Sequence, residues 1–231
     1  MPRLQSLLNF IKSYNTKADN DALSDSKNAH FFSIPENRDI NESIRGILRL
    51  PYSFFIEQNS HENSEQLLKA LVSSDSPDLL LSISTYSTYT SNLSHLLTES
   101  INDRFKLNGN KYNEIKTCLH EAIINAALHG NLSIASNFQT TKGLYSYQTE
   151  ISKRLNMDIY KSRRINIMVW NKNDHLQISV SDEGNGFSIA NFKEDFTSPN
   201  GRGLMLIIRM SDSMWVGSDK RTLVMAFSHS A

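Results

Sequence analysis

The sequence predicts an α/β fold: a two-layer sandwich with helices on one face of a mostly antiparallel sheet, preceded by an N-terminal extension. Three observations lead to this fold class. From residue 77 onward, apolar residues recur with a period of two in some segments and with a helical period in others. Two strand-like segments are separated by a short polar turn, as in an antiparallel hairpin. The order strand, helix, helix, hairpin, helix, strand then favours helices gathered on one side of the sheet.

The elements expected after residue 77 follow from apolar spacing and from the residues that interrupt it. One helix keeps Leu93, Leu97 and Ile101 on a single face, and Asn108-Gly109 ends it. Gly130 stands where the next helix would end. The expected helices are 89–105, 111–129, 147–155 and 201–212, and the expected strands are DLLLSIST (78–85), RINIMVW (164–170), HLQISVS (175–181) and TLVMAFS (222–228).

Residues 1–76 form the expected extension. Helical spacing of Leu4, Leu7, Leu8 and Ile11 predicts a short amphipathic helix at the start, followed by a polar segment without periodicity. A strand is expected after Pro51, and a second helix over residues 63–74.

Composition excludes several classes of function. The chain has 231 residues with 24 basic and 24 acidic side chains, so it has no overall field to attract nucleic acid or an anionic membrane. The single cysteine, Cys118, excludes an intrachain disulfide and a cysteine-based zinc site. There is no apolar run of membrane-spanning length and no signal-peptide pattern. We therefore expect a cytoplasmic protein that contacts neither membrane nor nucleic acid directly.

The stretch HEAIINAALHGN (120–131) carries a polar stripe on an otherwise apolar helix. Glu121, Asn125 and His129 lie four residues apart, so they share one face. An enclosed carboxylate is costly unless it is paired or hydrogen-bonded, and a hydrated magnesium ion would satisfy both the acid and the amide. The alternative is a core helix whose polar groups bond to neighbouring backbone. The apolar neighbours of the stripe are Ala122, Ile123 and Ala126 on one side and Ile124 and Leu128 on the other.

Two glycine-containing motifs follow. In SDEGNGF (181–187), Asp182 comes just past a core strand, where a carboxylate can accept from an exocyclic amino group. Gly184 and Gly186 would let a flat ligand approach the backbone. In GRGLMLI (201–207), two glycines open a helix whose free N–H groups suit phosphate. The alternatives are a glycine-rich turn and an ordinary helix start. Neither a P-loop nor a dinucleotide fingerprint is present.

Together and in this order, the three motifs resemble the ATP-binding boxes of the GHKL ATPase superfamily, which includes the histidine kinase-like ATPase domains. Within it, EAIINAALHGN with GRGL is most similar to the anti-sigma-factor serine/threonine kinase branch. The resemblance covers residues 77–231 and implies ATP and Mg²⁺ as cofactors.

The resemblance also implies a role for each motif residue. Glu121 would be the general base and Asn125 the magnesium ligand, while Asp182 would bind the adenine amino group. Thr222 on the last strand would support the adenine pocket. The residues expected to bind nucleotide are Asn125, His129, Asp182, Gly184, Gly186, Gly201, Arg202, Gly203, Leu204 and Thr222.

The function implied is transfer of the γ-phosphoryl group of Mg-ATP to a serine or threonine of a STAS-domain (anti-anti-sigma) partner. A sigma factor would be a second partner, and a homodimer is in keeping with the family. Two alternatives remain open: a module that uses ATP to grip a partner without transferring phosphate, and a histidine-kinase-like catalytic domain acting in trans.

The chain departs from the compact serine kinases in two places. About 33 residues separate the first motif from the hairpin, and they contain a basic cluster that includes Lys153, Arg154 and Lys161. Before residue 77, PYSFFIEQNSHENSEQLLKALVSS faintly resembles the last strand and helix of a receiver domain, although a whole receiver does not fit there. Residues 1–76 are therefore either a degenerate receiver remnant or an arm that packs on the domain or a partner.

Overall fold

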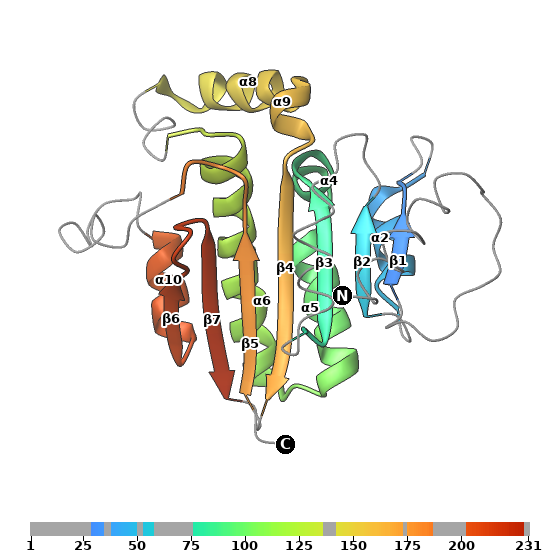
Figure 1. Cartoon of the computed structure of the whole chain (residues 1–231). Helices are drawn as coiled ribbons and strands as arrows, with labels where there is room; N and C mark the ends of the chain where they lie inside the picture. The colour runs from blue at the N-terminus through green and yellow to red at the C-terminus, as the bar shows by residue number, and fades with distance from the viewer. Residues whose placement is uncertain are drawn as a thin grey trace, which may run out of the picture.

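A seven-stranded sheet in the order β1-β2-β3-β4-β5-β7-β6 dominates the computed structural model (Figure 1). The model describes residues 29–34, 38–49, 53–57, 76–135, 142–172, 175–186 and 202–228. The strands are β1 (Ala29–Phe32), β2 (Phe54–Glu57), β3 (Leu79–Ser84), β4 (Arg164–Lys172), β5 (His175–Ser181), β6 (Ser213–Val216) and β7 (Thr222–Ser228).

Most neighbouring strands are antiparallel, as predicted. The β3–β4, β4–β5, β5–β7 and β6–β7 pairs are antiparallel, and only β1–β2 and β2–β3 run parallel. The helices are α2 (Ile40–Ile47), α4 (Thr85–Thr90), α5 (Leu93–Phe105), α6 (Gly109–Asn125), α8 (Leu144–Leu155), α9 (Asp158–Lys161) and α10 (Arg202–Met210), with a π-helix, η1 (Ala126–Asn131), after α6.

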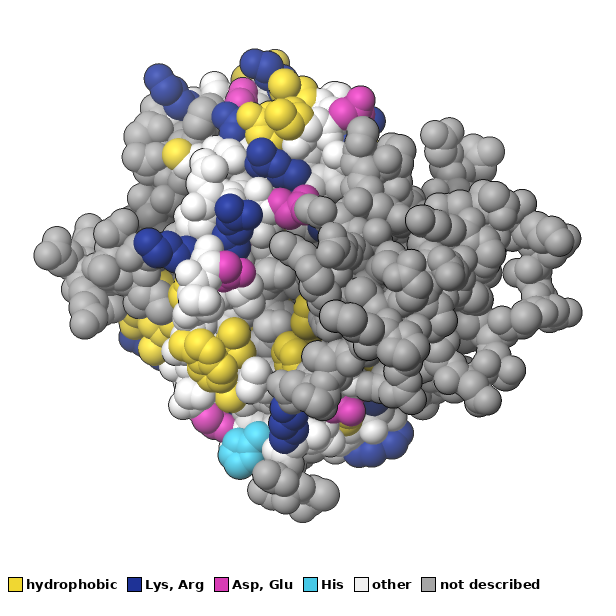
Figure 2. Space-filling view, viewed as in Figure 1, with side chains coloured by type: hydrophobic (Ala, Val, Ile, Leu, Met, Phe, Trp, Pro, Cys, Tyr) yellow, Lys and Arg dark blue, Asp and Glu magenta, His cyan; other side chains and the backbone are white. Residues whose placement is uncertain are grey.

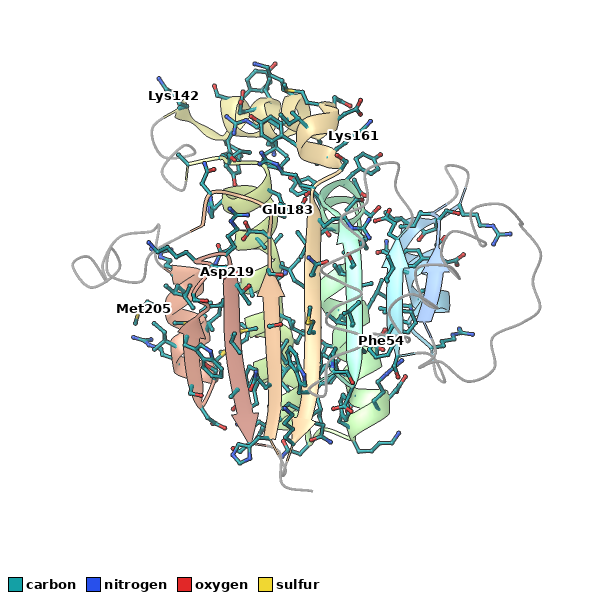
Figure 3. All side chains as sticks on the ribbon, viewed as in Figure 1. Phe54, Lys142, Lys161, Glu183, Met205 and Asp219 are labelled. Atoms are coloured by element: carbon teal, nitrogen blue, oxygen red, sulfur yellow. The ribbon has the colours of Figure 1, made fainter. Side chains whose placement is uncertain are left out.

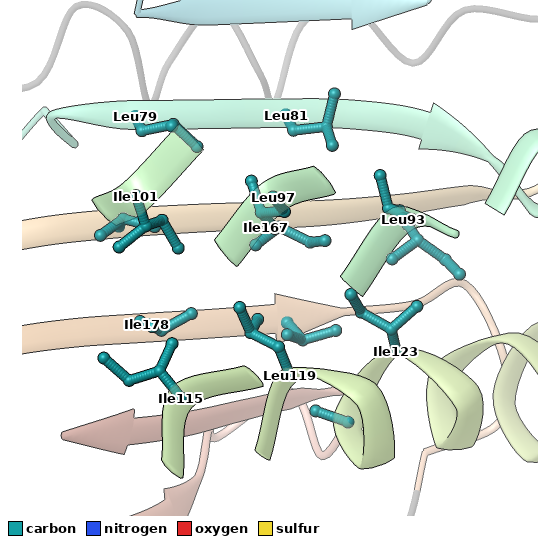
Figure 4. Packing of buried hydrophobic residues seen from close by; sticks show 14 of the residues in the cluster. Leu79, Leu81, Leu93, Leu97, Ile101, Ile115, Leu119, Ile123, Ile167 and Ile178 are labelled. Atoms are coloured by element: carbon teal, nitrogen blue, oxygen red, sulfur yellow. The ribbon is translucent and has the colours of Figure 1, made fainter. Parts of the chain in front are cut away.

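Helices α5, α6 and α10 cover one face of the sheet (Figure 1). Leu93, Leu97 and Ile101 of α5 are buried, as the helical spacing predicted, because residues four apart share a face. Ile115, Leu119 and Ile123 repeat the pattern on α6 (Figure 4). Alternate strand residues meet them, since every second side chain of a strand points to the same face. The sheet contributes Leu79, Leu81, Ile83, Ile165, Ile167, Val169, Leu176, Ile178, Val180, Leu223, Met225 and Phe227 to this core.

Several elements differ from the expected ones. The residues of the predicted helix 89–105 fall in two helices. Helix α4 begins earlier, at Thr85, where Ser84 caps it by accepting from the Ser87 amide at 3.1 Å, and α5 begins at Leu93. The strand β6 was not predicted. It is four residues long and its side chains are exposed or half-buried, so its apolar signal is weak.

The described part of the extension joins the same sheet. Strands β1 and β2 add in parallel to the edge of β3, with α2 between them in the chain. The strand expected after Pro51 is β2. The predicted helices 2–13 and 63–74 lie outside the described residues. Within the part of the chain that the structure describes, none of the helices combines the length and apolar character needed to cross a membrane.

Candidate functional site

A cavity of about 370 Å³ opens between α6, η1, the end of β5 and the start of α10. This volume is in the range that binds small organic ligands. The expected residues that line it are Asn125, His129, Asp182, Gly186, Gly203 and Leu204. Thus the structure brings the polar stripe, the hairpin end and the glycine-led helix to one place, although they are far apart in the chain.

The polar stripe runs from the edge of the cavity to the surface. Glu121 and Asn125 are half-buried, and His129 is exposed. The ring Nδ1 of His129 lies 2.7 Å from the carbonyl oxygen of Ile134, another cavity residue. The stripe is therefore enclosed at its first two members only, and His129 belongs to the rim.

Glu121 packs against the first turn of α10. A Cβ built on Gly203 would lie 2.3 Å from Glu121 Oε2, so no larger residue fits there unless the carboxylate moves. Gly203 lines the cavity, and Glu121 itself stands just behind it. Asn125 and Gly203 therefore line the cavity, and the Glu121 carboxylate lies against Gly203 without lining it.

The predicted helix 111–129 changes its winding before it ends. After Asn125 the chain continues as the π-helix η1, in which the Leu132 amide donates to the Ala127 carbonyl at 2.8 Å. Gly130 therefore lies inside this wider turn and does not mark a helix end. A Cβ on Gly130 would lie 2.4 Å from the Asp182 carboxyl carbon. π-Turns that interrupt α-helices are frequent at functional sites. Here the turn places the backbone of Gly130 against the Asp182 carboxylate.

Asn131, which the sequence did not single out, holds this turn in place. Its side chain is fully buried and donates to Thr85 Oγ1 at 2.8 Å and to the Arg164 carbonyl at 3.0 Å. Its amide oxygen accepts from the backbone N–H of Glu183 at 2.7 Å. One amide thus joins η1, α4, β4 and the loop after β5.

Asp182 is the acid of the cavity. Its Oδ1 accepts from the Gly184 amide at 2.8 Å. Burial raises the pKa of the carboxyl to about 6, and the bond from Gly184 and the charges of Arg221 and Arg163 only partly offset this effect. The ionised carboxylate is therefore under-solvated and favours a ligand that donates hydrogen bonds to it.

The two glycines after Asp182 have different roles. Gly184 is buried, and a Cβ there would lie 2.4 Å from the Gly130 carbonyl oxygen, so it permits the contact with η1. Gly186 lines the cavity with φ of +79°, a conformation that L side chains rarely adopt. Glu183, labelled in Figure 3, follows the end of β5, and its carboxylate accepts from the Arg164 amide at 2.8 Å.

Four of the expected residues that the structure describes do not line the cavity: Glu121, Gly184, Arg202 and Thr222. Arg202 is exposed at the start of α10, and Gly201 lies outside the described residues. The Thr222 hydroxyl donates to Asp219 at 2.7 Å, away from the cavity. Side chains alternate along the strand, so the neighbours Arg221 and Leu223 line the cavity and Thr222 does not.

Sequence reasoning missed part of the lining. Ala122 and Ala126 stand one position after Glu121 and Asn125, and their small side chains leave room beside the stripe. The same four-residue spacing was a usable signal for them. Ser133, Ile134, Ala135 and Asn185 lie in irregular segments, where no periodicity marks them.

The donors near the cavity suit a hard cation only together with a ligand. In the described ranges, no group of three His, Cys, Asp or Glu side chains could hold a metal alone. Asn125 and Glu121 offer two oxygen donors on one helix face, and Mg²⁺ commonly combines few protein ligands with water and phosphate oxygens. The residues present therefore fit a magnesium ion that arrives with a phosphate compound.

The fold and the cavity define a nucleotide-binding α/β sandwich protein. Residues 84–227 match the model of the histidine kinase-like ATPase domain, which is more than half of the chain. The chain therefore belongs to the histidine kinase-like ATPase family and is an ATP-binding protein. No curated protein matches the chain.

Proposed function

We propose that this protein is a Mg-ATP-dependent serine/threonine kinase of the anti-sigma-factor type, with a STAS-domain protein as its phosphate acceptor. The observation that carries the proposal is that the Glu121 carboxylate lies against Gly203, which lines the cavity together with Asn125. A carboxylate, an amide that would hold a magnesium ion and a helix start are thus close together, and they could supply the positioning and charge stabilisation that phosphoryl transfer needs.

Asp182 would bind the adenine. Its carboxylate is desolvated in the absence of a ligand, so a donating amino group would be a strong partner. GTP carries an oxygen at the corresponding position and would face the carboxylate with an acceptor. The small side chains of Ala122 and Ala126 would flank the ring.

Asn125 and the start of α10 would hold the triphosphate. The backbone at Gly186 and Gly203 is open to the cavity, and the first turn of a helix offers unpaired N–H groups. A magnesium ion, when bound, neutralises the developing charge on the phosphates. The exposed Arg202 guanidinium would reach phosphate from the solvent side.

Glu121 would receive the proton of the acceptor hydroxyl. As the hydroxyl oxygen forms its bond to the γ-phosphorus, the bond between that phosphorus and the β–γ bridging oxygen breaks. ADP leaves, and the hydroxyl proton passes to the Glu121 carboxylate. Its position against Gly203 would keep the carboxylate beside the phosphates bound by α10.

One observation favours a second function, an ATP-dependent gripping module. Glu121 lies behind Gly203 and not on the cavity wall, which is also where a purely structural clamp between α6 and α10 would stand. In that case ATP would order the site for partner binding without phosphate transfer.

Single-turnover assays with labelled ATP separate these functions. Purified protein is mixed with STAS-domain proteins of the same genome, and acid-stable label on serine or threonine is measured. We expect Glu121→Gln to bind ATP as the wild type does but to transfer phosphate at least about a hundredfold more slowly. Absence of transfer with every acceptor would support the gripping module, and an acid-labile product would indicate a histidine kinase-like domain acting in trans.

A further inference from the structure

The exposed apolar residues of this protein are concentrated beside the cavity. In the described ranges, eight large hydrophobic side chains are exposed; five of these belong to α4, α8 and α9, and a sixth, Met157, directly precedes α9. We call this surface the α4–α8–α9 platform. It consists of Tyr86, Tyr89, Leu144, Tyr145, Met157 and Ile159.

The three helices form one surface. Helix α4 contacts α9, and α9 contacts α8. Below them, Ile151 and Leu155 of α8 pack on Leu128, Leu132 and Ile134 in a small core of their own. The platform is thus a folded unit with its own buried side. Its exposed apolar side chains lie outside that small core.

The platform is also positively charged in a chain that has no net charge. Residues 142–163 contain five Lys and Arg residues but only two acids, Glu150 and Asp158. Both acids are already paired, with Arg154 at 2.6 Å and Lys161 at 2.8 Å. Basic and hydrophobic side chains lie next to each other at the top of the molecule in Figure 2. Lys142 and Lys161 mark the two ends of the unit in Figure 3.

Two arginines link the platform to the segment beside the cavity through hydrogen bonds. Arg154 donates to the Leu132 carbonyl at 2.5 Å, and Arg163 donates to the Asn131 carbonyl at 2.7 Å. Both guanidinium groups lie over the ring of Tyr160, at 5.5 and 5.0 Å from its centre. Arg163 also reaches the hydroxyl of Ser133, a cavity residue, at 3.4 Å. A molecule seated on the platform is therefore held beside the cavity.

We propose that the α4–α8–α9 platform is the docking surface for the phosphate-accepting protein, and that the acceptor meets it with an apolar patch flanked by Asp and Glu. Exposed tyrosines and aliphatic side chains at the centre of a contact supply its affinity. Surrounding lysines select an acidic partner and accelerate its encounter. This inference rests on the proposed kinase function, because it assigns the surface that brings the hydroxyl to the cavity.

An anionic membrane is the other partner that basic and apolar side chains together would fit. The observations favour a protein. Two tyrosines of the platform stand on α4, which contacts η1, and η1 contributes Ala126, His129 and Gly130 to the cavity wall, so the surface adjoins the nucleotide site.

The test uses the full chain with Mg-ATP and the purified STAS-domain proteins of the same genome as probes. Two platform variants are compared, the apolar pair Tyr145→Ser with Ile159→Ser and the charge pair Lys142→Glu with Lys153→Glu. All four residues are exposed, so the fold should tolerate the changes. The matched control is Ile208→Ser with Arg209→Glu, an exposed apolar and basic pair on α10.

We expect each platform pair to raise both the Kd and the KM for the acceptor at least about tenfold, with the Kd for ATP and the Tm unchanged. The control pair should leave all four values as in the wild type. Acceptor binding should also weaken with added salt, and the charge pair should reduce that dependence.

Other outcomes separate the inference from the kinase function. Transfer with an unchanged KM in both platform pairs overturns the inference and leaves the kinase function standing. Platform-dependent binding without transfer supports the docking surface and overturns the kinase function. The inference also fails if none of the STAS-domain proteins binds the wild type, or if phosphatidylglycerol vesicles bind it in a platform-dependent manner while the proteins do not.

Discussion

Asp182→Asn should stabilise the empty protein while it weakens ATP binding. Burial raises the pKa of this carboxyl from an ordinary value of 3.8 to about 6. Above pH 6 the folded protein therefore carries a desolvated charge that the unfolded chain solvates freely. Two pKa units correspond to roughly 3 kcal/mol. An asparagine keeps an oxygen that can accept from the Gly184 amide but carries no charge. We therefore expect the free energy of unfolding to rise by about 1–3 kcal/mol at pH 8.

The size of this stabilisation depends on pH. An acid whose pKa is raised on folding costs stability fully above its folded pKa, and the cost is gone below its unfolded pKa. The advantage of Asp182→Asn should therefore be largest at pH 7–8 and should shrink as the pH falls through 6 towards 4. In a chain of this size, each kcal/mol shifts the Tm by about 2–4 °C. Thermal unfolding of the wild type and of Asp182→Asn between pH 5 and 8 measures this difference in Tm.

Asp219→Asn is the matched control with the opposite sign. Burial alone would raise the pKa of Asp219, but hydrogen bonds from Thr222 and Arg221 more than offset it and lower the pKa. Removal of this charge should therefore destabilise the protein at neutral pH. If Asp182→Asn leaves the Tm at pH 8 unchanged or lower, or binds ATP as the wild type does, the argument from desolvation is refuted.

Three further changes test other parts of the site. Asn125→Ala should remove most of the magnesium dependence of ATP binding, measured by titration with and without Mg²⁺, and leave the Tm of the empty protein within about 2 °C. Gly184→Ala should cost about 1–3 kcal/mol or more in chemical denaturation, because its Cβ would meet the Gly130 carbonyl. Gly46→Ala, with open space around it in α2, should be neutral or stabilising. Arg163→Ala should weaken ATP binding several-fold by releasing Asn131 and Ser133, although Arg163 does not line the cavity; an unchanged Kd would show that the rim holds its shape without it.

The elements that could be predicted are those in which local spacing and burial agree. The apolar faces of α5 and α6 repeat every four residues, β4 and β5 alternate, and β3 and β7 are short, mainly apolar runs, so the main sheet and its helix layer follow from the pattern. The short strand β6 lies at the edge, where half-exposed side chains leave little signal.

The site shows the same division between local and tertiary information. Glu121, Asn125 and Asp182 are chemically unusual at their positions, and the sequence singles them out; of these, Asn125 and Asp182 line the cavity. Asn131 looks like an ordinary residue after a glycine, and only tertiary contacts bury it and satisfy all three of its hydrogen bonds. Thr222 was assigned from its place in the chain, whereas the alternation along β7 decides which side chains reach the cavity.

The π-turn explains why the Asp182 carboxylate is desolvated on one side and open to the cavity on the other. An ordinary helix end would carry Gly130 away, whereas the wider turn sets it against Asp182, and Gly184 in turn against Gly130. Backbone thus replaces water on one side of the carboxylate and raises its pKa, while the other side opens to the cavity. A ligand that donates a hydrogen bond relieves a cost that the empty fold carries. Two glycines and one change of helical winding therefore give Asp182 a desolvated carboxylate at the cavity, which would favour a hydrogen-bond donor such as the adenine amino group of the proposed ligand.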